Sequence, residues 1–183
     1  MSKNNSAKDA VENQIDELSK QIGYTINEYT IGFLADEMQK NENGIFYLSE
    51  YQREFIWEPK HISRFVESVV MGLPIPFIFC YANIKTEKLE IIDGSQRLRS
   101  LQEFIHGEFR LKKLDRLTEL SGKTFNDLSE SRQRKIRNRS IRGIVLNEYT
   151  DAKARQDLFD RINTSSKPAT PAKIRRSAFQ GAF

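Results

Sequence analysis

The stretch that decides the fold reads Leu89-Glu90-Ile91-Ile92-Asp93-Gly94-Ser95-Gln96-Arg97-Leu98. It begins as an apolar strand, breaks at the glycine, and continues as a helix whose apolar positions recur at helical spacing. A strand that runs through a tight turn into a helix leaves the N–H groups of the first helical turn without backbone partners. Such N–H groups, at the positive end of the helix dipole, attract phosphate. The stretch therefore predicts a strand–turn–helix unit that carries a candidate anion site.

The charged side chains around this turn suit the same chemistry. Arg97 and Arg99 add positive charge to the start of the helix, and the planar guanidinium of Arg97 fits phosphate oxygens. Asp93, at the end of the strand, is a candidate to hold a divalent cation or to orient a water molecule. A simpler interpretation stays open, in which the segment is an ordinary glycine turn followed by a capped helix with a solvated face.

Two more segments combine residue types that bind nucleotides. Tyr51-Gln52-Arg53 precede Trp57 between a predicted strand and a predicted helix, where an aromatic ring beside Gln and Arg can stack on a base and contact phosphate. Residues 159–168 form a polar loop rich in hydrogen-bond donors after a predicted helix end. Each segment also has a plain explanation: surface polar residues for the first, and a helix–loop–helix connection for the second.

Between Glu130 and Glu148 the chain carries basic residues without an intervening acid. Such a run can follow a nucleic-acid backbone electrostatically. A solvated helix face explains it equally, and the formal net charge of +4 does not decide between the two. The residues concerned are Arg132, Arg134, Lys135, Arg137, Arg139 and Arg142.

The rest of the chain predicts a single α+β domain. Its helices are mixed with strands that are joined by a hairpin, rather than alternating with strands in regular βαβ units. We expect disorder over residues 1–10 and one folded domain over 11–183. The predicted helices cover about 11–21, 31–42, 59–71, 95–106, 151–162 and a segment starting at Thr170-Pro171, and residues 125–139 are expected to form a short loop and a strongly basic helix. The predicted strands cover 45–48, 77–81, 89–92 and 141–146, with an edge strand at Phe109 to Leu111.

Composition excludes several classes of protein. No stretch approaches the ~18 apolar residues that a membrane span needs, and the polar N-terminus lacks the apolar segment of a secretory signal. The single cysteine, Cys80, cannot form an internal disulfide, which favours a cytoplasmic location, and its apolar surroundings predict an inert buried thiol. With two histidines far apart, a structural zinc site and a histidine-based triad are both disfavoured.

Four segments in order resemble the family known as domain of unknown function 262, over roughly residues 25–181. They are Tyr51-Gln52-Arg53 with Trp57, Gly72-Leu73-Pro74-Ile75-Pro76, Ile92-Asp93-Gly94-Ser95-Gln96-Arg97-Leu98, and Arg161-Ile162-Asn163. That family is similar in fold to the ParB/sulfiredoxin nucleotide-binding domain, so the resemblance implies a mixed sheet with flanking helices. The family signature reads Asp-Gly-Gln-Gln-Arg, and the third position here is Ser95.

The resemblance implies an NTP-binding and NTP-hydrolysing regulatory domain of a restriction or anti-phage defence system that targets DNA. By position, Asp93, Gln96 and Arg97 would form the catalytic or phosphate-facing set, with Asp93 holding Mg²⁺ and Gln96 orienting the attacking water. The other residues of the implied nucleotide pocket are Tyr51, Gln52, Arg53, Gly94, Ser95, Arg161 and Asn163.

Many relatives carry a nuclease domain after this one, but no histidine follows His106 here, so we expect no nuclease activity from this chain alone. The expected partners are an NTP, DNA and a nuclease domain or subunit, with a homo-oligomer left open. Two other functions remain open. One is a DNA-binding module without NTP turnover that uses Arg132 to Arg142, and the other is a protein-interaction scaffold.

Overall fold

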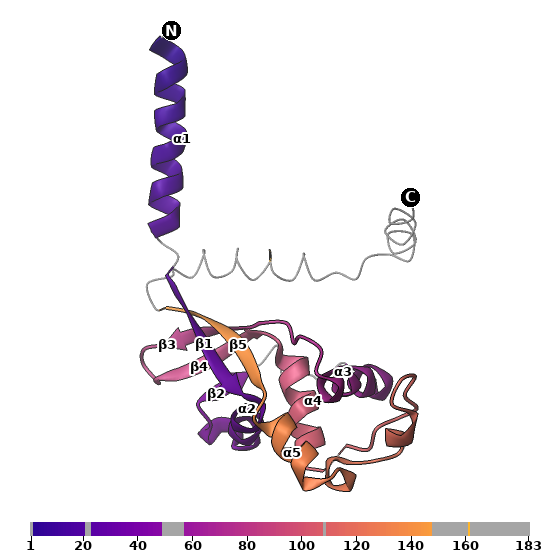
Figure 1. The fold of residues 1–183 in the computed structure, drawn as a ribbon. Helices are drawn as coiled ribbons and strands as arrows, with labels where there is room; N and C mark the ends of the chain where they lie inside the picture. The colour runs from indigo at the N-terminus through magenta and orange to yellow at the C-terminus, as the bar shows by residue number, and fades with distance from the viewer. Residues whose placement is uncertain (1, 21–22, 49–56, 108, 148–160, 162–183) are drawn as a thin grey trace, which may run out of the picture.

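The computed structural model describes residues 2–20, 23–48, 57–107, 109–147 and 161. Within them the chain forms five α-helices and one mixed sheet of five strands, which confirms the predicted α+β class (Figure 1). Helices α2 to α5 gather on one side of the sheet, whereas α1 stands apart from it (Figure 1).

The sheet has the strand order β1-β5-β3-β4-β2. Strands β3 and β4 form the predicted antiparallel hairpin, β5 runs parallel to β3, and β1 pairs antiparallel with β5. The edge strand β2 runs parallel to β4, so both strands end at the same edge of the sheet. The bounds are β1 Tyr24–Thr30, β2 Phe46–Leu48, β3 Ile78–Asn83, β4 Lys88–Asp93 and β5 Ser140–Leu146.

Local signals set the limits of the helices. The Thr30 side chain accepts a hydrogen bond from the N–H of Phe33 at the start of α2. Pro59 opens α3, and Gly72 ends it in the left-handed conformation with φ of 90°. The bounds are α1 Ser2–Lys20, α2 Ile31–Gln39, α3 Pro59–Met71, α4 Ser95–Ile105 and α5 Glu130–Arg137, with 3-10 turns η1 Asn41–Asn43, η3 Thr118–Leu120 and η4 Phe125–Asp127.

The core lies between the sheet and α4. On the sheet Ile78, Cys80 and Ile91 are fully buried, and on α4 Leu98 and Leu101 are 1% exposed. Each such apolar side chain contributes about 1.5–3 kcal/mol to folding. Helices α2 and α3 both pack against α4, which places α4 at the centre of the helical layer.

The predicted burial of Cys80 is confirmed. The thiol is buried on β3, and this burial raises its pKa to about 12. A thiol that stays protonated at neutral pH is a poor nucleophile.

The structure departs from the sequence-based prediction at two places. Residues 24–30 form β1, which the sequence analysis did not assign, and all of them except Tyr29 are exposed. The edge strand predicted at Phe109 to Leu111 is wrong, since this segment is irregular. Leu111 is nevertheless buried, and its N–H donates to the carbonyl of Lys123 at 2.9 Å.

The two ends of the chain bear on the remaining predictions. Helix α1 includes residues 2–10, and the side chains of residues 8–20 are all exposed. A helix with no buried face gains little stability from packing, so disorder over residues 1–10 stays a prediction. The helix predicted over 151–162 falls outside the described residues apart from Arg161, which is helical, and so does the segment from Thr170 onward.

Arg139 closes the C-terminal end of α3. Its guanidinium donates to the carbonyl oxygen of Val69 at 2.7 Å and also to that of Leu73. We expect Arg139→Gln to lower the free energy of unfolding by roughly 1–3 kcal/mol, because helix-end carbonyls lose a charged donor. Chemical denaturation measures the change. Arg132→Gln, at an exposed position of α5, is the matched control and should shift stability by less than about 0.5 kcal/mol. Equal stability of the two variants would contradict the capping role.

The buried carboxylate of Glu37 connects α2 to the start of β2. It accepts the N–H of Ile45 at 2.8 Å and the Lys40 ammonium at 2.5 Å, and the backbone bond is the main reason that its pKa lies below the ordinary value. A carboxylate with a lowered pKa stabilises the fold above its unfolded pKa and loses that contribution as pH falls through the folded pKa.

We therefore expect Glu37→Gln to cost about 1 kcal/mol near neutral pH and less as the pH falls from about 6 to about 3. Urea unfolding at several pH values measures this difference. The control is Glu119→Gln, which is exposed on η3 and should change stability by less than about 0.5 kcal/mol. A difference between wild type and Glu37→Gln that does not change with pH would refute the assignment.

Candidate functional site

The turn between β4 and α4 is closed by a glycine for a steric reason. Gly94 has φ of 99°, and a Cβ built there would lie 2.7 Å from Cγ2 of Ile78 on β3. Any other residue would combine a strained backbone with a collision against the core. The predicted strand–turn–helix unit is therefore confirmed, and Gly94 rather than Ser95 occupies the N-cap position.

The start of α4 presents backbone donors. The carbonyl of Gly94 accepts the N–H of Leu98 at 3.0 Å, but glycine has no side chain that could cap the helix. Among the described residues, no acceptor takes the N–H of Ser95 or of Arg97. These donors lie at the C-terminal end of β4 and at the positive end of the α4 dipole, a geometry that suits an anion.

The Arg97 side chain points toward the protein itself. Its guanidinium donates to the carbonyls of Pro76 and Phe77 at 2.7 and 3.0 Å and to Oδ2 of Asp93 at 2.5 Å. The side chain is 12% exposed, and burial lowers its pKa although the Asp93 carboxylate acts in the opposite direction. Arg97 therefore fixes the turn against the segment that leads into β3.

The neighbouring side chains of Asp93 and Gln96 each form a hydrogen bond through one oxygen atom. Oδ2 of Asp93 accepts from Arg97, whereas Oδ1 accepts no hydrogen bond from the described residues, and this carboxylate is 25% exposed. Oε1 of Gln96 accepts the N–H of Trp57 at 3.1 Å, which joins the approach to α3 to the first turn of α4. Asp93 thus keeps one oxygen for a further ligand.

A magnesium ion held together with a nucleotide fits this arrangement. Mg²⁺ bound beside substrate phosphates often uses only one or two protein carboxylates and keeps several waters. The described part of the chain holds no group of three or more His, Cys, Asp or Glu side chains arranged for a metal. Within the described residues, the donor for such an ion is the Asp93 carboxylate, whose Oδ1 accepts no hydrogen bond from them.

The other residues predicted for the nucleotide pocket are placed only in part. Tyr51, Gln52, Arg53 and Asn163 lie outside the described residues, and Arg161 is exposed in a helical conformation. Two described residues on either side of residues 51–53, Leu48 and Trp57, lie beside the turn at Gly94. Leu48 pairs with Ile91 on β4, and Trp57 is bonded to Gln96.

The basic run divides into two kinds of residue. Arg132, Arg134 and Lys135 are exposed on α5, where Arg134 lies 3.3 Å from Glu130 in an exposed pair. Arg137 instead lies 2.6 Å from Asp36 on α2, and Arg139 binds the carbonyls at the end of α3. The first three are exposed to solvent, whereas the last two bind groups of the fold.

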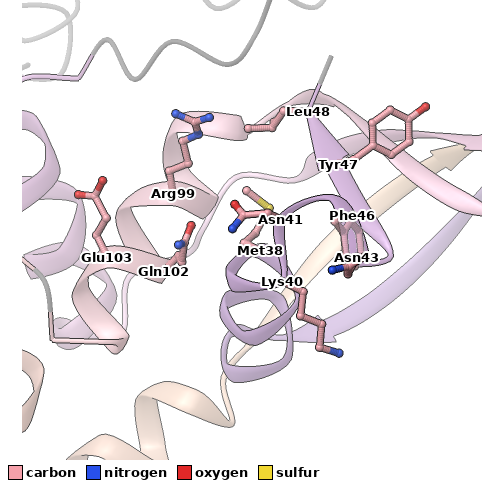
Figure 2. A pocket seen from close by; sticks show the side chains of 10 residues that line it. All are labelled: Met38, Lys40, Asn41, Asn43, Phe46, Tyr47, Leu48, Arg99, Gln102 and Glu103. Carbon is pink, nitrogen blue, oxygen red and sulfur yellow. The ribbon is translucent and has the colours of Figure 1, made fainter. Parts of the chain in front are cut away.

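A cavity of about 740 Å³ lies beside α4, and the sequence analysis did not identify it. Figure 2 shows Arg99, Gln102 and Glu103 projecting from α4, with Met38 and Asn41 across the gap on α2 and η1. The sequence signalled only the charge of Arg99, because the opposite wall comes from residues more than fifty positions earlier. The lining residues are Met38, Lys40, Asn41, Asn43, Phe46, Tyr47, Leu48, Arg99, Gln102 and Glu103.

The described helices include none that is long and apolar enough to cross a membrane.

Comparisons with curated proteins and with solved structures gave no match. Residues 34–180 match a family model described as the GmrSD restriction endonuclease, N-terminal domain. This match confirms the restriction and defence part of the resemblance, whereas the likeness to the ParB/sulfiredoxin domain stays a prediction. It spans β2 to β5, including the turn at Gly94 and the cavity beside α4. The chain therefore belongs to the family of GmrSD restriction endonuclease N-terminal domains.

Proposed function

We propose that this domain binds a nucleoside triphosphate with Mg²⁺ at the turn between β4 and α4, and that it hydrolyses the nucleotide to regulate a restriction system. The observation that carries the proposal is the start of α4, where the N–H groups of Ser95 and Arg97 meet no described acceptor beside the Asp93 carboxylate. Helix N–H donors supply charge stabilisation to phosphate without covalent chemistry, and phosphoryl transfer depends mainly on such positioning.

Within this proposal the side chains of the turn have separate roles. Asp93 would hold Mg²⁺, which neutralises phosphate charge when bound, and Arg97 would position Asp93 through the 2.5 Å bond to Oδ2. Gln96 would orient the attacking water, a role that its amide must combine with accepting the N–H of Trp57. We further propose that Tyr51, Gln52, Arg53, Arg161 and Asn163 complete the pocket.

A nuclease domain or subunit is the proposed partner of this domain, since the matched family is that of a restriction endonuclease.

A second candidate function, DNA binding, is favoured by one observation. Arg132 and Lys135, three residues apart on α5, share an exposed face of the helix, and Arg134 is exposed beside Glu130. Binding through so few phosphate contacts would weaken with added salt, although less steeply than binding through the whole basic run. Nucleotide binding and DNA binding are compatible, because a nucleotide can favour one conformation of a DNA-binding protein.

Thermal unfolding with ATP, GTP, CTP or UTP, each with and without Mg²⁺, tests the proposed function. A bound nucleotide at about 100 times its Kd should stabilise the fold by roughly 2.7 kcal/mol. We expect Asp93→Asn to lose the magnesium-dependent part of this shift, because an amide is a weaker Mg²⁺ ligand than a carboxylate. Each shift is measured against the same variant without ligand, since the substitution also weakens the bond to Arg97.

The matched control is Asp115→Asn, which is exposed and should keep the full magnesium-dependent shift. Release of inorganic phosphate, with and without duplex DNA, then separates turnover from binding. A wild-type protein that no nucleotide stabilises, with or without Mg²⁺, would overturn the proposal. A magnesium-dependent shift that survives Asp93→Asn would remove Asp93 from the site.

A further inference from the structure

Three charged side chains line the cavity beside α4, and they differ in the interactions that they form within the protein. Lys40 lies 2.5 Å from the buried Glu37 carboxylate, so its charge is matched within the protein. Glu103, on α4, attracts Arg99 electrostatically. Arg99 itself forms no hydrogen bond or ion pair with a described residue, and burial lowers its pKa despite Glu103.

A partly buried guanidinium for which the described part of the chain supplies no acceptor is unusual. Arginine carries five N–H donors, and donors that are withdrawn from water without a partner cost free energy. The other polar groups of the cavity are mainly neutral amides, from Asn41, Asn43 and Gln102. Gln102 donates through Nε2 to Oε1 of Gln39 at 2.8 Å, and it forms no hydrogen bond with Arg99. Glu103 is the carboxylate of the described lining, and it acts on Arg99 without an ion pair between them, so the Arg99 guanidinium keeps donors that no described residue accepts.

The size and lining of the cavity suit a small molecule with an apolar part. Its volume of about 740 Å³ lies within the usual range of roughly 300–1,000 Å³ for ligand sites. Met38, Phe46 and Leu48 supply apolar surface opposite the polar face of α4 (Figure 2). An anionic ligand with a flat, partly apolar body, such as a nucleotide, matches this combination.

The cavity wall on α4 begins at Arg99, one helical turn after Ser95. Gln96 and Arg99 are three residues apart on α4 and so share one face of the helix. Arg99 follows Ser95 by four residues, which is ~6 Å along the helix axis and within the length of an arginine side chain. A phosphate chain that begins at the N–H groups of the turn can thus reach Arg99.

We infer that the cavity between η1, β2 and α4 binds a phosphorylated ligand and that Arg99, rather than Arg97, is the side chain that contacts its phosphates. The inference rests on the proposed function, because the ligand is taken to be the nucleoside triphosphate. Arg97 is satisfied by Asp93, Pro76 and Phe77, whereas Arg99 has donors to offer.

Isothermal titration of the folded chain tests this inference with two probes, a magnesium nucleoside triphosphate and inorganic tripolyphosphate. Arg99→Gln should weaken both by roughly 10- to 100-fold, since it removes charged hydrogen bonds to phosphate. Its melting temperature without ligand should change little, because the guanidinium forms no hydrogen bond or ion pair with a described residue. Arg64→Gln, exposed on α3, is the matched control and should bind both probes as wild type does.

Two further variants keep the test decisive if Arg99→Gln does not fold. Arg99→Lys retains the charge and should recover part of the affinity. Asn41→Asp places a carboxylate in the cavity wall and should weaken both probes by repulsion while Arg99 is intact.

The outcomes separate the inference from the proposed function. If Arg99→Gln binds the nucleotide as tightly as wild type, the role of Arg99 is overturned and the proposed function stands. If wild type binds tripolyphosphate through Arg99 but no nucleotide, the anion site stands and the proposed function fails. If wild type binds neither probe, both fail.

Discussion

The arrangement of the site depends on the fork of hydrogen bonds made by Arg97. This guanidinium joins the end of β4, through Asp93, to the carbonyls of Pro76 and Phe77 at the entrance to β3. Because Gly94 leaves no room for a Cβ against Ile78, the chain turns tightly between these anchors, and α4 starts close to the sheet. The orientation of α4, its exposed N–H groups and one wall of the adjacent cavity all follow from this fixed turn.

The same fork changes the part that charge plays at the site. Arg97 uses its donors within the protein and so fixes geometry rather than offering its charge to a phosphate, whereas Oδ1 of Asp93 accepts no hydrogen bond from the described residues. In our proposal, an incoming phosphate meets the backbone donors of the turn first and then Arg99, which forms no hydrogen bond or ion pair with a described residue. Arg97 thus has a structural role, and we propose the ligand-binding role for Arg99, two residues later on the same helix.

Much of the fold could be predicted from the sequence, because its local signals are strong. Thr30, Pro59 and Gly72 mark helix ends, and the hairpin around residues 84–87 joins two apolar runs. Strand β1 escaped prediction because an exposed edge strand lacks apolar alternation, and it is held by pairing with β5.

The candidate site could be located at Asp93 to Arg97, but two features could not be predicted. The inward direction of Arg97 depends on carbonyls about twenty residues earlier, and the cavity depends on the packing of η1 and β2 near α4.

The central claim is that the turn at Gly94 and the face of α4 beside it form one phosphate-binding surface. Backbone amide chemical shifts, followed by NMR during titration with a magnesium nucleoside triphosphate, test this claim most directly. The account predicts that the largest shift changes fall on residues 94–99 and on η1, with α5 unaffected. Changes concentrated on α5, with residues 94–99 unmoved, would contradict it.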